Sequence, residues 1–463
     1  MKTVALCDRT LCRPGSAFSF KEKIEIARQL ENLSVDAIEL PLIENVRTDV
    51  LLVKTISSFV KKAVLSVDAG GTAQGVENAA AALTSAAHAR IRISLPVSTV
   101  NMEYTYHKKA PKMQQLIETL VRQAKDVCAD VEFCALDATR AEEGFLPAAI
   151  TAAVQAGATS VTLCDMEGVM LPDAFAAFAG NLLASLNLPA GVTLGVQYND
   201  RNGLAAASSI LAVQAGVDVV KTACGGDCVE LGVFGSLLKN CGGMCDLTAN
   251  LELTRLGRTL SQIGRFLGGS VGIPIAAAAD ADSGLHFDVK DSQESIAAAV
   301  RQLGYDLTVE DEAKVYSEFL RVAAKKTVGT RELEAIVASA ALQVPSAYKL
   351  QSYVVQSGNV LSPSAQIRLE KDGEILTGIA MGDGPIDAAF LTVEQIVGQH
   401  YELDDFQINA VTEGTEAMGS ALVKLRCDGK LYSGNGISTD IVGASIRAYL
   451  SALNKILYEE AQK

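Results

Sequence analysis

Short apolar runs recur along the first half of the chain, each ending in small or acidic residues, and helix-like segments separate them. Runs of about four to eight residues, bounded by breaks, are typical of buried parallel strands. We expect such strands at residues 3–8, 36–41, 64–69, 90–96, 130–137, 160–165, 192–200 and 218–226. Eight strands alternating with helices predict a (β/α)8 TIM barrel, with a doubly wound open sheet as the alternative.

Apolar positions fall three or four residues apart in the stretch that follows the last expected strand. Residues 246–270 and 291–345 show this spacing, for instance at Ile296, Val300 and Leu303. Positions so spaced share one face of an amphipathic helix. We therefore expect a helical connector after the barrel.

The pattern changes to strand-like alternation beyond Pro345, and this tail contains an internal repeat. Ser364–Leu369, followed by Asp372-Gly373, returns as Ser420–Leu425, followed by Asp428-Gly429. Each Asp-Gly pair predicts a tight hairpin turn, and a glycine-containing loop then leads into a helix. The tail therefore predicts an α+β domain of two ββα repeats.

The chain divides, by these patterns, into three parts. We place the TIM barrel at residues 1–270, the helical connector subdomain at 271–345 and the C-terminal domain at 346–463. The last predicted helix carries apolar residues that we expect to need cover from a second chain: Ile446, Tyr449, Leu450 and Leu453. This predicts a homodimer formed through the C-terminal domain.

Charge and composition limit the possible partners. The 463 residues include 40 basic and 54 acidic side chains, a net charge of -14, which repels nucleic acid and anionic membranes. The chain starts without the basic and apolar pattern of a signal peptide, and no apolar segment nears the roughly 20 residues of a membrane helix. We expect a cytoplasmic protein with no nucleic-acid or membrane partner, whose 10 cysteines are reduced thiols.

Several short motifs follow one another in a consistent order along the chain. They are Asp8–Leu11, Pro14–Phe18, Asp137–Arg140, Asp165 with Gly168, Asn199–Arg201, Ser283–His286, Gly382–Ala388, Ser438–Ile441 and Ala444–Asn454. In this order they resemble the α-isopropylmalate, citramalate and homocitrate synthases. The resemblance implies a barrel that condenses an acyl-CoA with a 2-oxo acid, and a C-terminal leucine- or isoleucine-sensing dimer domain.

The resemblance also implies a divalent metal that grips the 2-oxo acid, and here this sequence departs from the family. The metal ligands of the family are an aspartate, two histidines and a nearby asparagine, whose positions hold Arg13, Val196, Tyr198 and Gly225. A guanidinium about 4 Å from a divalent ion would oppose it by roughly 8 kcal/mol at an effective dielectric near 20. We therefore expect no cofactor, and a divalent metal only if the chain is an active synthase.

Substrate-handling positions of the family are replaced as well, by Cys12, Leu136 and Met166. The candidate catalytic residues that remain are Asp8, Cys12, Arg13 and His286. Cys12 is a possible nucleophile whose pKa Arg13 would lower. His286 matches a family histidine implicated in proton transfer, and the alternative is a relic that packs at a subunit contact.

Thiols form a further candidate site, because several cysteines fall at expected strand ends, where barrels hold their chemistry. Cys134, Cys164, Cys224 and Cys228 would suit a soft metal or an iron–sulfur cluster. The alternative is that they are small buried hydrophobic residues.

The predicted starts of the two C-terminal helices form a candidate effector site, because backbone N–H groups there can receive a carboxylate and aspartates can accept an ammonium. The candidate residues are Gly382, Asp383, Gly384, Asp387, Gly436 and Asp440. They predict binding of a small amino acid.

Three functions remain open at this point. The first is a non-catalytic, amino-acid-responsive paralog, either a homodimer or a hetero-oligomer with an active synthase. The second is a repurposed, metal-free enzyme in which Arg13 binds a carboxylate substrate directly. The third is an active acyltransferase that forms a 2-hydroxy dicarboxylic acid with the help of a divalent metal.

Overall fold

The computed structural model describes residues 1–13, 18–267, 286–289, 291–303, 305, 307, 309–324, 327–340, 346–358, 361–410 and 419–460. They form two compact units. The first comprises residues 1–13 and 26–264, and the second comprises residues 18–25, 265–267 and the described residues from 286 onward.

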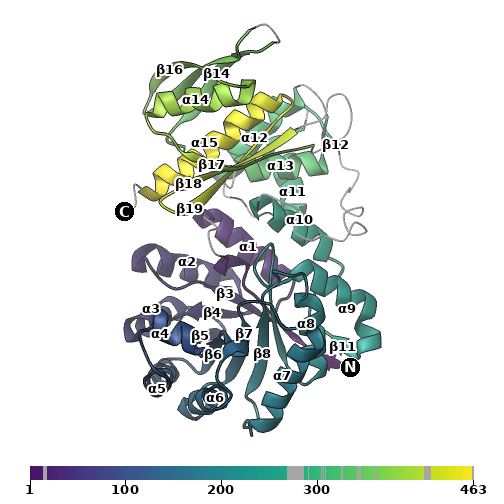
Figure 1. Cartoon of the computed structure of the whole chain (residues 1–463). Coiled ribbons are helices and arrows are strands. Elements are labelled where there is room, and N and C mark those ends of the chain that lie inside the picture. Colours follow the sequence, from purple (N-terminus) through teal and green to yellow (C-terminus); the bar gives the residue numbers. More distant parts are fainter. Residues whose placement is uncertain are drawn as a thin grey trace. The chain divides into compact units, whose positions relative to one another are not determined.

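The first unit is a closed barrel of parallel strands (Figure 1). The strands are β2 (Ala5–Asp8), β3 (Ala37–Leu40), β4 (Val64–Asp68), β5 (Ala89–Pro96), β6 (Asp130–Leu136), β7 (Ser160–Asp165), β8 (Thr193–Tyr198) and β9 (Val219–Ala223). Because β9 pairs with both β8 and β2, the sheet closes on itself. The eight expected strands and the TIM barrel are confirmed, and the open-sheet alternative is wrong.

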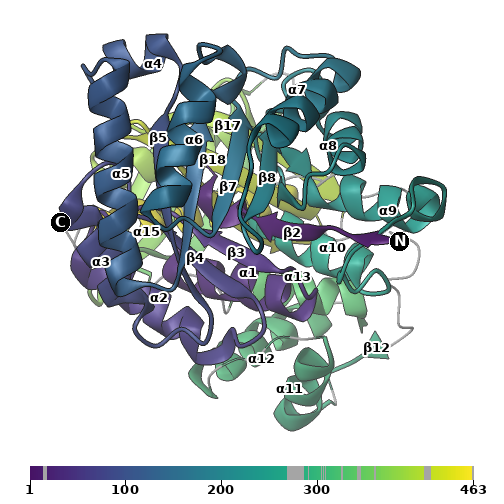
Figure 2. The ribbon, with the colours of Figure 1, turned by 90° about the horizontal axis from the view of Figure 1, so that it is seen from below.

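Helices surround this ring of strands, as Figure 2 shows. They are α2 (Val46–Phe59), α3 (Ala73–Leu83), α4 (Thr99–Tyr104), α5 (Ala110–Val127), α6 (Phe145–Ala156), α7 (Pro172–Ser185), α8 (Ala205–Gln214) and α9 (Leu231–Cys245). Gly157 follows α6 with φ 115° and Gly216 follows α8 with φ 120°. Since L-residues with side chains avoid this region, both glycines allow the chain to leave a helix and enter the next strand.

Short elements complete the first unit. They are β1 (Lys2–Thr3), η1 (Thr10–Cys12), η2 (Ala138–Arg140), β10 (Val229–Glu230) and β11 (Leu247–Thr248). Helices α1 (Phe20–Asn32) and α10 (Leu256–Leu267) each have residues in both units. The expected helix over 246–270 is therefore wrong in its first part, where β11 pairs with β1.

The second unit begins with helices and ends with two antiparallel sheets. Its elements are β12 (His286–Phe287), α11 (Gln293–Gln302), α12 (Val309–Ala323), β13 (Val328–Gly329), α13 (Thr330–Ala340), β14 (Lys349–Gln356), β15 (Ser364–Lys371), β16 (Glu374–Met381), α14 (Pro385–Val397), β17 (Glu402–Ala410), β18 (Gly419–Cys427), β19 (Lys430–Ser438) and α15 (Ile441–Glu460). Asp372 and Asp428 take positive φ at the two hairpin turns, each followed by a glycine that does the same, as the Asp-Gly pairs predicted.

Each C-terminal repeat has one strand more than expected. The observed order is three strands and a helix, β14-β15-β16-α14 and β17-β18-β19-α15. We did not predict the first strand of each repeat, because hydrophobic and polar residues alternate only weakly there. No residue of β14 is fully buried, and β17 begins with Glu-Leu-Asp-Asp. Their place in the sheets is set by pairing with β15 and β18.

Helix α15 packs closely on its own sheet. A Cβ added at Gly434 would lie 2.1 Å from the carbonyl oxygen of Ala448, so only glycine permits this approach. Tyr449 and Leu453 of α15 are buried within the chain, as are Ile446 and Leu450. The expectation that this face needs a partner's cover is wrong, because the chain's own sheets cover it.

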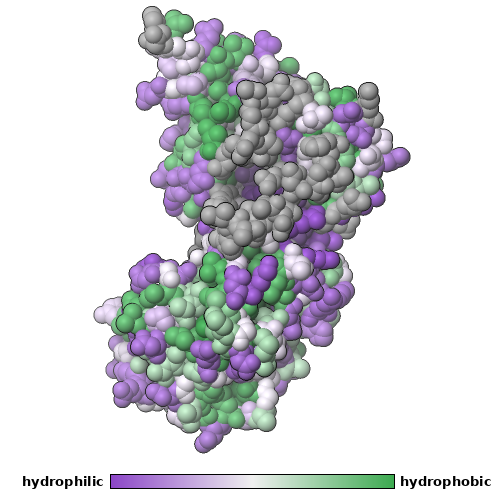
Figure 3. All heavy atoms as spheres, turned by 90° about the vertical axis from the view of Figure 1, so that its right-hand side faces the viewer, coloured by the Kyte–Doolittle hydropathy of each residue, from purple (hydrophilic) through white to green (hydrophobic). Residues whose placement is uncertain are grey.

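Among the described helices, none is long and apolar enough to cross a membrane. On the face of the barrel unit that Figure 3 presents, hydrophilic and hydrophobic residues alternate. Single exposed apolar residues of this kind are normal on a folded surface.

Candidate functional site

The interior of the barrel holds buried charges. Lys221 on β9 is 1% exposed, and its Nζ lies 2.5 Å from Glu39 Oε1 and 2.7 Å from Glu132 Oε1. Burial opposes the ammonium charge, but Cys134 and the two glutamates outweigh it and raise the pKa of Lys221. Lys221 is therefore a fixed cation, because the carboxylates that hold it also keep it protonated.

A second cation extends this network across the barrel. Arg92 on β5 places Nη1 3.1 Å from Glu39 Oε2 and Nη2 3.4 Å from Asp68 Oδ2. It also donates to the carbonyl oxygen of Leu40 at 3.2 Å. Barrel interiors are usually filled by layers of branched aliphatic side chains, whereas this one contains an ionic core, which we define as Glu39, Arg92, Glu132 and Lys221.

The mouth at the carboxyl ends of the strands carries further charged groups. Arg9 pairs with Asp227 at 3.1 Å and lies 3.7 Å from Glu39. Arg13 follows η1 and is partly buried; burial lowers its pKa, while the carboxylates of Glu230 and Asp227 raise it. The structure therefore places Arg13 at the mouth, facing two acidic side chains.

Cys12 lies at the same mouth, but it is not an activated thiol. Burial raises its pKa to about 11, although Arg92 and Arg9 act to lower it. The expectation that Arg13 lowers the pKa of Cys12 is wrong. Since the thiolate is the nucleophile, Cys12 is a poor one in this setting.

The two positions that match the metal-binding histidines of the family turn away from the interior. The ring of Tyr198 packs edge-on against Phe175 of α7, with centroids 4.9 Å apart, and its hydroxyl donates to the carbonyl oxygen of Met170. Side chains alternate along a strand, so Val196 shares this orientation. The residue between them, Gln197, instead contacts Cys164 of β7.

Sequence reasoning missed the ionic core and Gln197. The available signal was a charged residue inside an otherwise apolar strand run, as at Glu39, Arg92, Glu132 and Lys221. Such residues are almost never fully buried unless they are paired. Their presence in strands expected to be buried could have indicated mutual pairing.

The candidate thiols are buried. Burial raises the pKa of Cys134, Cys224 and Cys228, whereas a hydrogen bond with Cys134 lowers that of Cys164. Across the part of the chain that the structure describes, no three His, Cys, Asp or Glu residues are grouped so as to hold a metal ion.

Two other candidate catalytic residues lie in different surroundings, Asp8 at the end of β2 beside the mouth and His286 in the second unit. Asp8 is fully buried at the end of β2, where it accepts hydrogen bonds from the Thr10 amide at 2.9 Å and the Thr222 hydroxyl at 3.3 Å. The backbone of His286 pairs with Gly329 between β12 and β13, and its side chain lies outside the described residues.

The candidate effector residues lie at the starts of two different helices. Asp387 accepts from the Asp383 amide at 2.9 Å at the start of α14. Asp440 accepts from the amides of Val442 and Gly443 at the start of α15. Asp440 therefore caps α15, and Asp387 holds the residue that precedes the N-cap of α14.

Glycines of the same set have packing roles. A Cβ at Gly382 would lie 2.4 Å from the Ala388 amide, and one at Gly436 would lie 2.2 Å from the Ala444 carbonyl oxygen. At Gly384 a Cβ would meet nothing within 4 Å. Close packing of strand and helix thus accounts for Gly382 and Gly436 without a ligand.

Comparisons with known proteins agree with this architecture. The HMGL-like family matches residues 4–228, and the LeuA allosteric (dimerisation) domain matches residues 327–457. The HMG-CoA lyase of Bacillus subtilis covers 60% of this chain and 98% of its own, with a TM-score of 0.51 at 15% identity, which supports the fold alone. Together they define a barrel protein of the HMGL-like class with an allosteric-type C-terminal domain.

Relatives that match the chain over its full length identify the family within this class. A 2-isopropylmalate synthase of Carboxydothermus hydrogenoformans is 30% identical over 100% of this chain and 99% of the relative. One from Clostridium kluyveri is 29% identical over 97% of this chain and 95% of the relative. The chain belongs to the 2-isopropylmalate synthase family.

Family membership corrects one expectation. We expected no cofactor, but this family depends on a divalent metal. The residues at the corresponding positions do not fit such an ion: Arg13 is a cation, Val196 has no ligand atom, and Tyr198 packs against α7. A divalent ion carried by this chain would need other ligands.

The buried carboxyl of Asp8 generates a stability prediction. Burial raises the pKa of Asp8 from 3.8 to about 6, against the hydrogen bonds from Thr10 and Thr222. Between these pH values the folded protein keeps a proton that the unfolded chain has released. This proton therefore makes its full contribution to the free energy of unfolding below about pH 4. The contribution, about 3 kcal/mol in total, is lost as the pH rises to about 6.

Asp8→Asn preserves the shape of the side chain and cannot ionise. We expect its melting temperature, relative to the unaltered protein, to rise between pH 4 and about 6 and then to level off up to pH 7.5. Asp126→Asn, at an exposed position on α5, is the matched control and should show no such trend. If the melting temperatures of Asp8→Asn and the unaltered protein change in parallel with pH, ionisation of Asp8 does not destabilise the fold.

Proposed function

We propose that this chain is a paralog of 2-isopropylmalate synthase that does not catalyse acyl-CoA condensation and that responds to a small amino acid through its C-terminal domain. The observation that carries the first part is the ionic core. Lys221 pairs with Glu39 and Glu132, and Arg92 pairs with Glu39, inside the barrel, so these charges are committed to one another. Groups held in this way have no proton to exchange with a substrate near neutral pH.

The mouth of the barrel supports the same conclusion. Condensation requires a polarised carbonyl and a base for the acyl-CoA methyl group. Arg13 brings a cation to the mouth, but Asp227 counters its charge, and so does Glu230 when it is ionised, since burial raises the pKa of Glu230 to about 7. A carboxylate substrate would have to compete with both acids, so the alternative of a metal-free enzyme that uses Arg13 is not favoured.

We expect no condensation of acetyl-CoA with 2-oxoisovalerate, pyruvate or 2-oxoglutarate. The measurement is release of free coenzyme A thiol, with magnesium, manganese and zinc supplied in turn and a 2-isopropylmalate synthase as positive control. Turnover of about 1 per second or more, within the usual range of enzymes, would contradict the proposal that the chain is not catalytic. If turnover is seen, its loss in Arg13→Gln would identify Arg13 as the substrate anchor.

We further propose that the chain forms a homodimer through the outer face of the β14–β16 sheet. Val354, Gln366 and Ile379 are paired across its three strands, and Val354 and Ile379 are 57% and 59% exposed. Met381 on the same sheet is 63% exposed. An apolar strip on a paired sheet favours burial against a second protein surface, and the dimerisation domain that matches this region makes a second copy the natural occupant.

Light scattering on the full chain should give twice the monomer mass. A double variant, Val354→Asp with Ile379→Asp, should give the monomer mass, because two like charges would meet their copies in the interface. Val309→Asp, at a position that is 80% exposed outside this sheet, is the control and should remain dimeric. A monomer in all cases rejects the homodimer; dimerisation only after mixing with an active synthase would make the chain a hetero-oligomeric subunit instead.

The sensing part of the proposal rests on the matched allosteric domain and on Asp383, which is exposed at the start of α14. We expect leucine, isoleucine or valine to raise the melting temperature of the full chain, since a ligand at 100 times its dissociation constant stabilises a fold by about 2.7 kcal/mol. Asp383→Asn should lose the shift, because the ammonium loses its charged partner.

Glu374→Gln is the control for that experiment, because it removes the same charge from an exposed position on β16 and should keep the shift. Asp440→Ala is not informative, since Asp440 caps α15. A flat melting temperature with all three amino acids and their 2-oxo acids would leave the C-terminal domain without a sensing role.

A further inference from the structure

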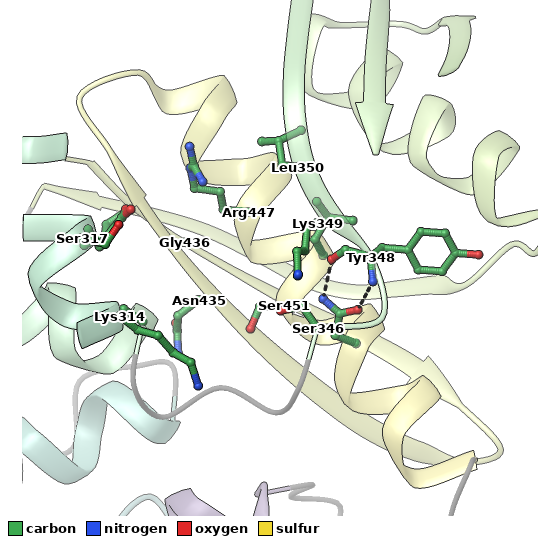
Figure 4. Close-up of a pocket in the computed structure, with 15 residues that line it drawn as sticks. Lys314, Ser317, Ser346, Tyr348, Lys349, Leu350, Asn435, Gly436, Arg447 and Ser451 are labelled. Atoms are coloured by element: carbon green, nitrogen blue, oxygen red, sulfur yellow. Dashed lines mark hydrogen bonds between the residues drawn. The ribbon is translucent and has the colours of Figure 1, made fainter. Parts of the chain in front are cut away.

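A cavity of about 380 Å³ lies in the second unit, between α12, β14, β19 and α15. This volume is at the lower end of the range of small-molecule sites. Figure 4 shows its lining residues, which come from segments more than 100 positions apart in the sequence. The cavity therefore exists only in the folded unit.

Three cations from three elements line this cavity: Lys314 of α12, Lys349 of β14 and Arg447 of α15. One carboxylate also lines the cavity, that of Glu318. It accepts a hydrogen bond from Arg321 Nε at 2.9 Å. Lys314 also pairs with Asp311, at 3.1 Å. The chain as a whole has a net charge of -14, so the cavity differs from it in carrying an excess of positive charge.

Arg447 carries a buried donor without a partner. Its Nε is buried and has no hydrogen-bond partner among the described residues. Burial and the neighbouring guanidinium of Arg321 lower the pKa of Arg447 more than the carboxylate of Glu318 raises it. A buried donor without an acceptor is costly, and an anion bound beside Arg447 would supply both the acceptor and the missing charge.

The walls of the cavity are held in place by hydrogen bonds. The Tyr348 amide donates to Asn454 Oδ1 at 2.9 Å, and Asn454 Nδ2 donates to the Tyr348 carbonyl oxygen at 3.0 Å. These bonds tie the start of β14 to α15 (Figure 4). Asn435 Nδ2 donates to the carbonyl oxygen of Arg265, so its side-chain oxygen remains as an acceptor for a hydroxyl group.

We propose that this cavity binds a small dicarboxylate, with one carboxylate on the guanidinium of Arg447 and the other on the ammonium groups of Lys314 and Lys349. A guanidinium presents two parallel N–H donors that match a carboxylate, and an ammonium suits the second, more open end. This site is distinct from the start of α14, where we propose that the amino acid binds. It does not depend on that sensing or on the absence of turnover.

The test is isothermal titration of the full chain with malate. We expect binding that weakens as ionic strength rises, because part of the attraction is between exposed charges. Arg447→Gln should weaken it at least tenfold, and Lys349→Gln should weaken it to a smaller extent. Lys430→Gln removes the same charge at a position that faces Glu459 instead of the cavity, and it should bind malate as the unaltered protein does.

Lys349 is exposed, so its variant reports on the site even if Arg447→Gln fails to fold. Acetate should bind much more weakly than malate, since it has one carboxylate for two cationic ends. Equal binding of acetate and malate, tighter binding of inorganic phosphate, or equal losses in Lys349→Gln and Lys430→Gln would each overturn the proposal. Failure here leaves the amino-acid experiment unaffected, because that one depends on Asp383.

Discussion

The ammonium of Lys221, held between two carboxylates inside the barrel, is the interaction on which the first unit depends. It joins β9 to β3 through Glu39 and to β6 through Glu132, and Arg92 adds β5 to the same set. Taking charges out of water is expensive, so the arrangement is stable only when every member is paired. Removing one partner from such a network typically costs about 3–5 kcal/mol, because it leaves an uncompensated buried charge.

The ionic core lies inside a barrel whose fold is that of the family. The strands, their order and the closure of the barrel are those of a TIM barrel, because fold depends on backbone pairing and on the outward apolar faces. The interior and the mouth hold the polar groups: the ionic core lies inside the barrel and Arg13 at its mouth, while Tyr198 packs toward α7.

The second unit uses different physical means. Helix α15 packs on its sheet at Gly434 and Gly436. Asp440 caps this helix, and Asp387 accepts a hydrogen bond from the chain just before α14. These features account locally for residues that the sequence suggested as effector contacts. A buried donor without a partner among the described residues lies elsewhere, at Arg447 Nε, where strands and helices from distant parts of the sequence line a cavity.

The sequence by itself determined the eight barrel strands, the Asp-Gly hairpins and the family, because strand patterns, turn preferences and motif order are local properties. It did not reveal that Lys221 pairs with Glu39, 182 positions away, that Tyr198 turns toward α7, or that Ile446 is covered by its own sheet. These depend on strand register and on which face of each element meets another. Tertiary structure alone decides such contacts, because they join residues that no local pattern connects.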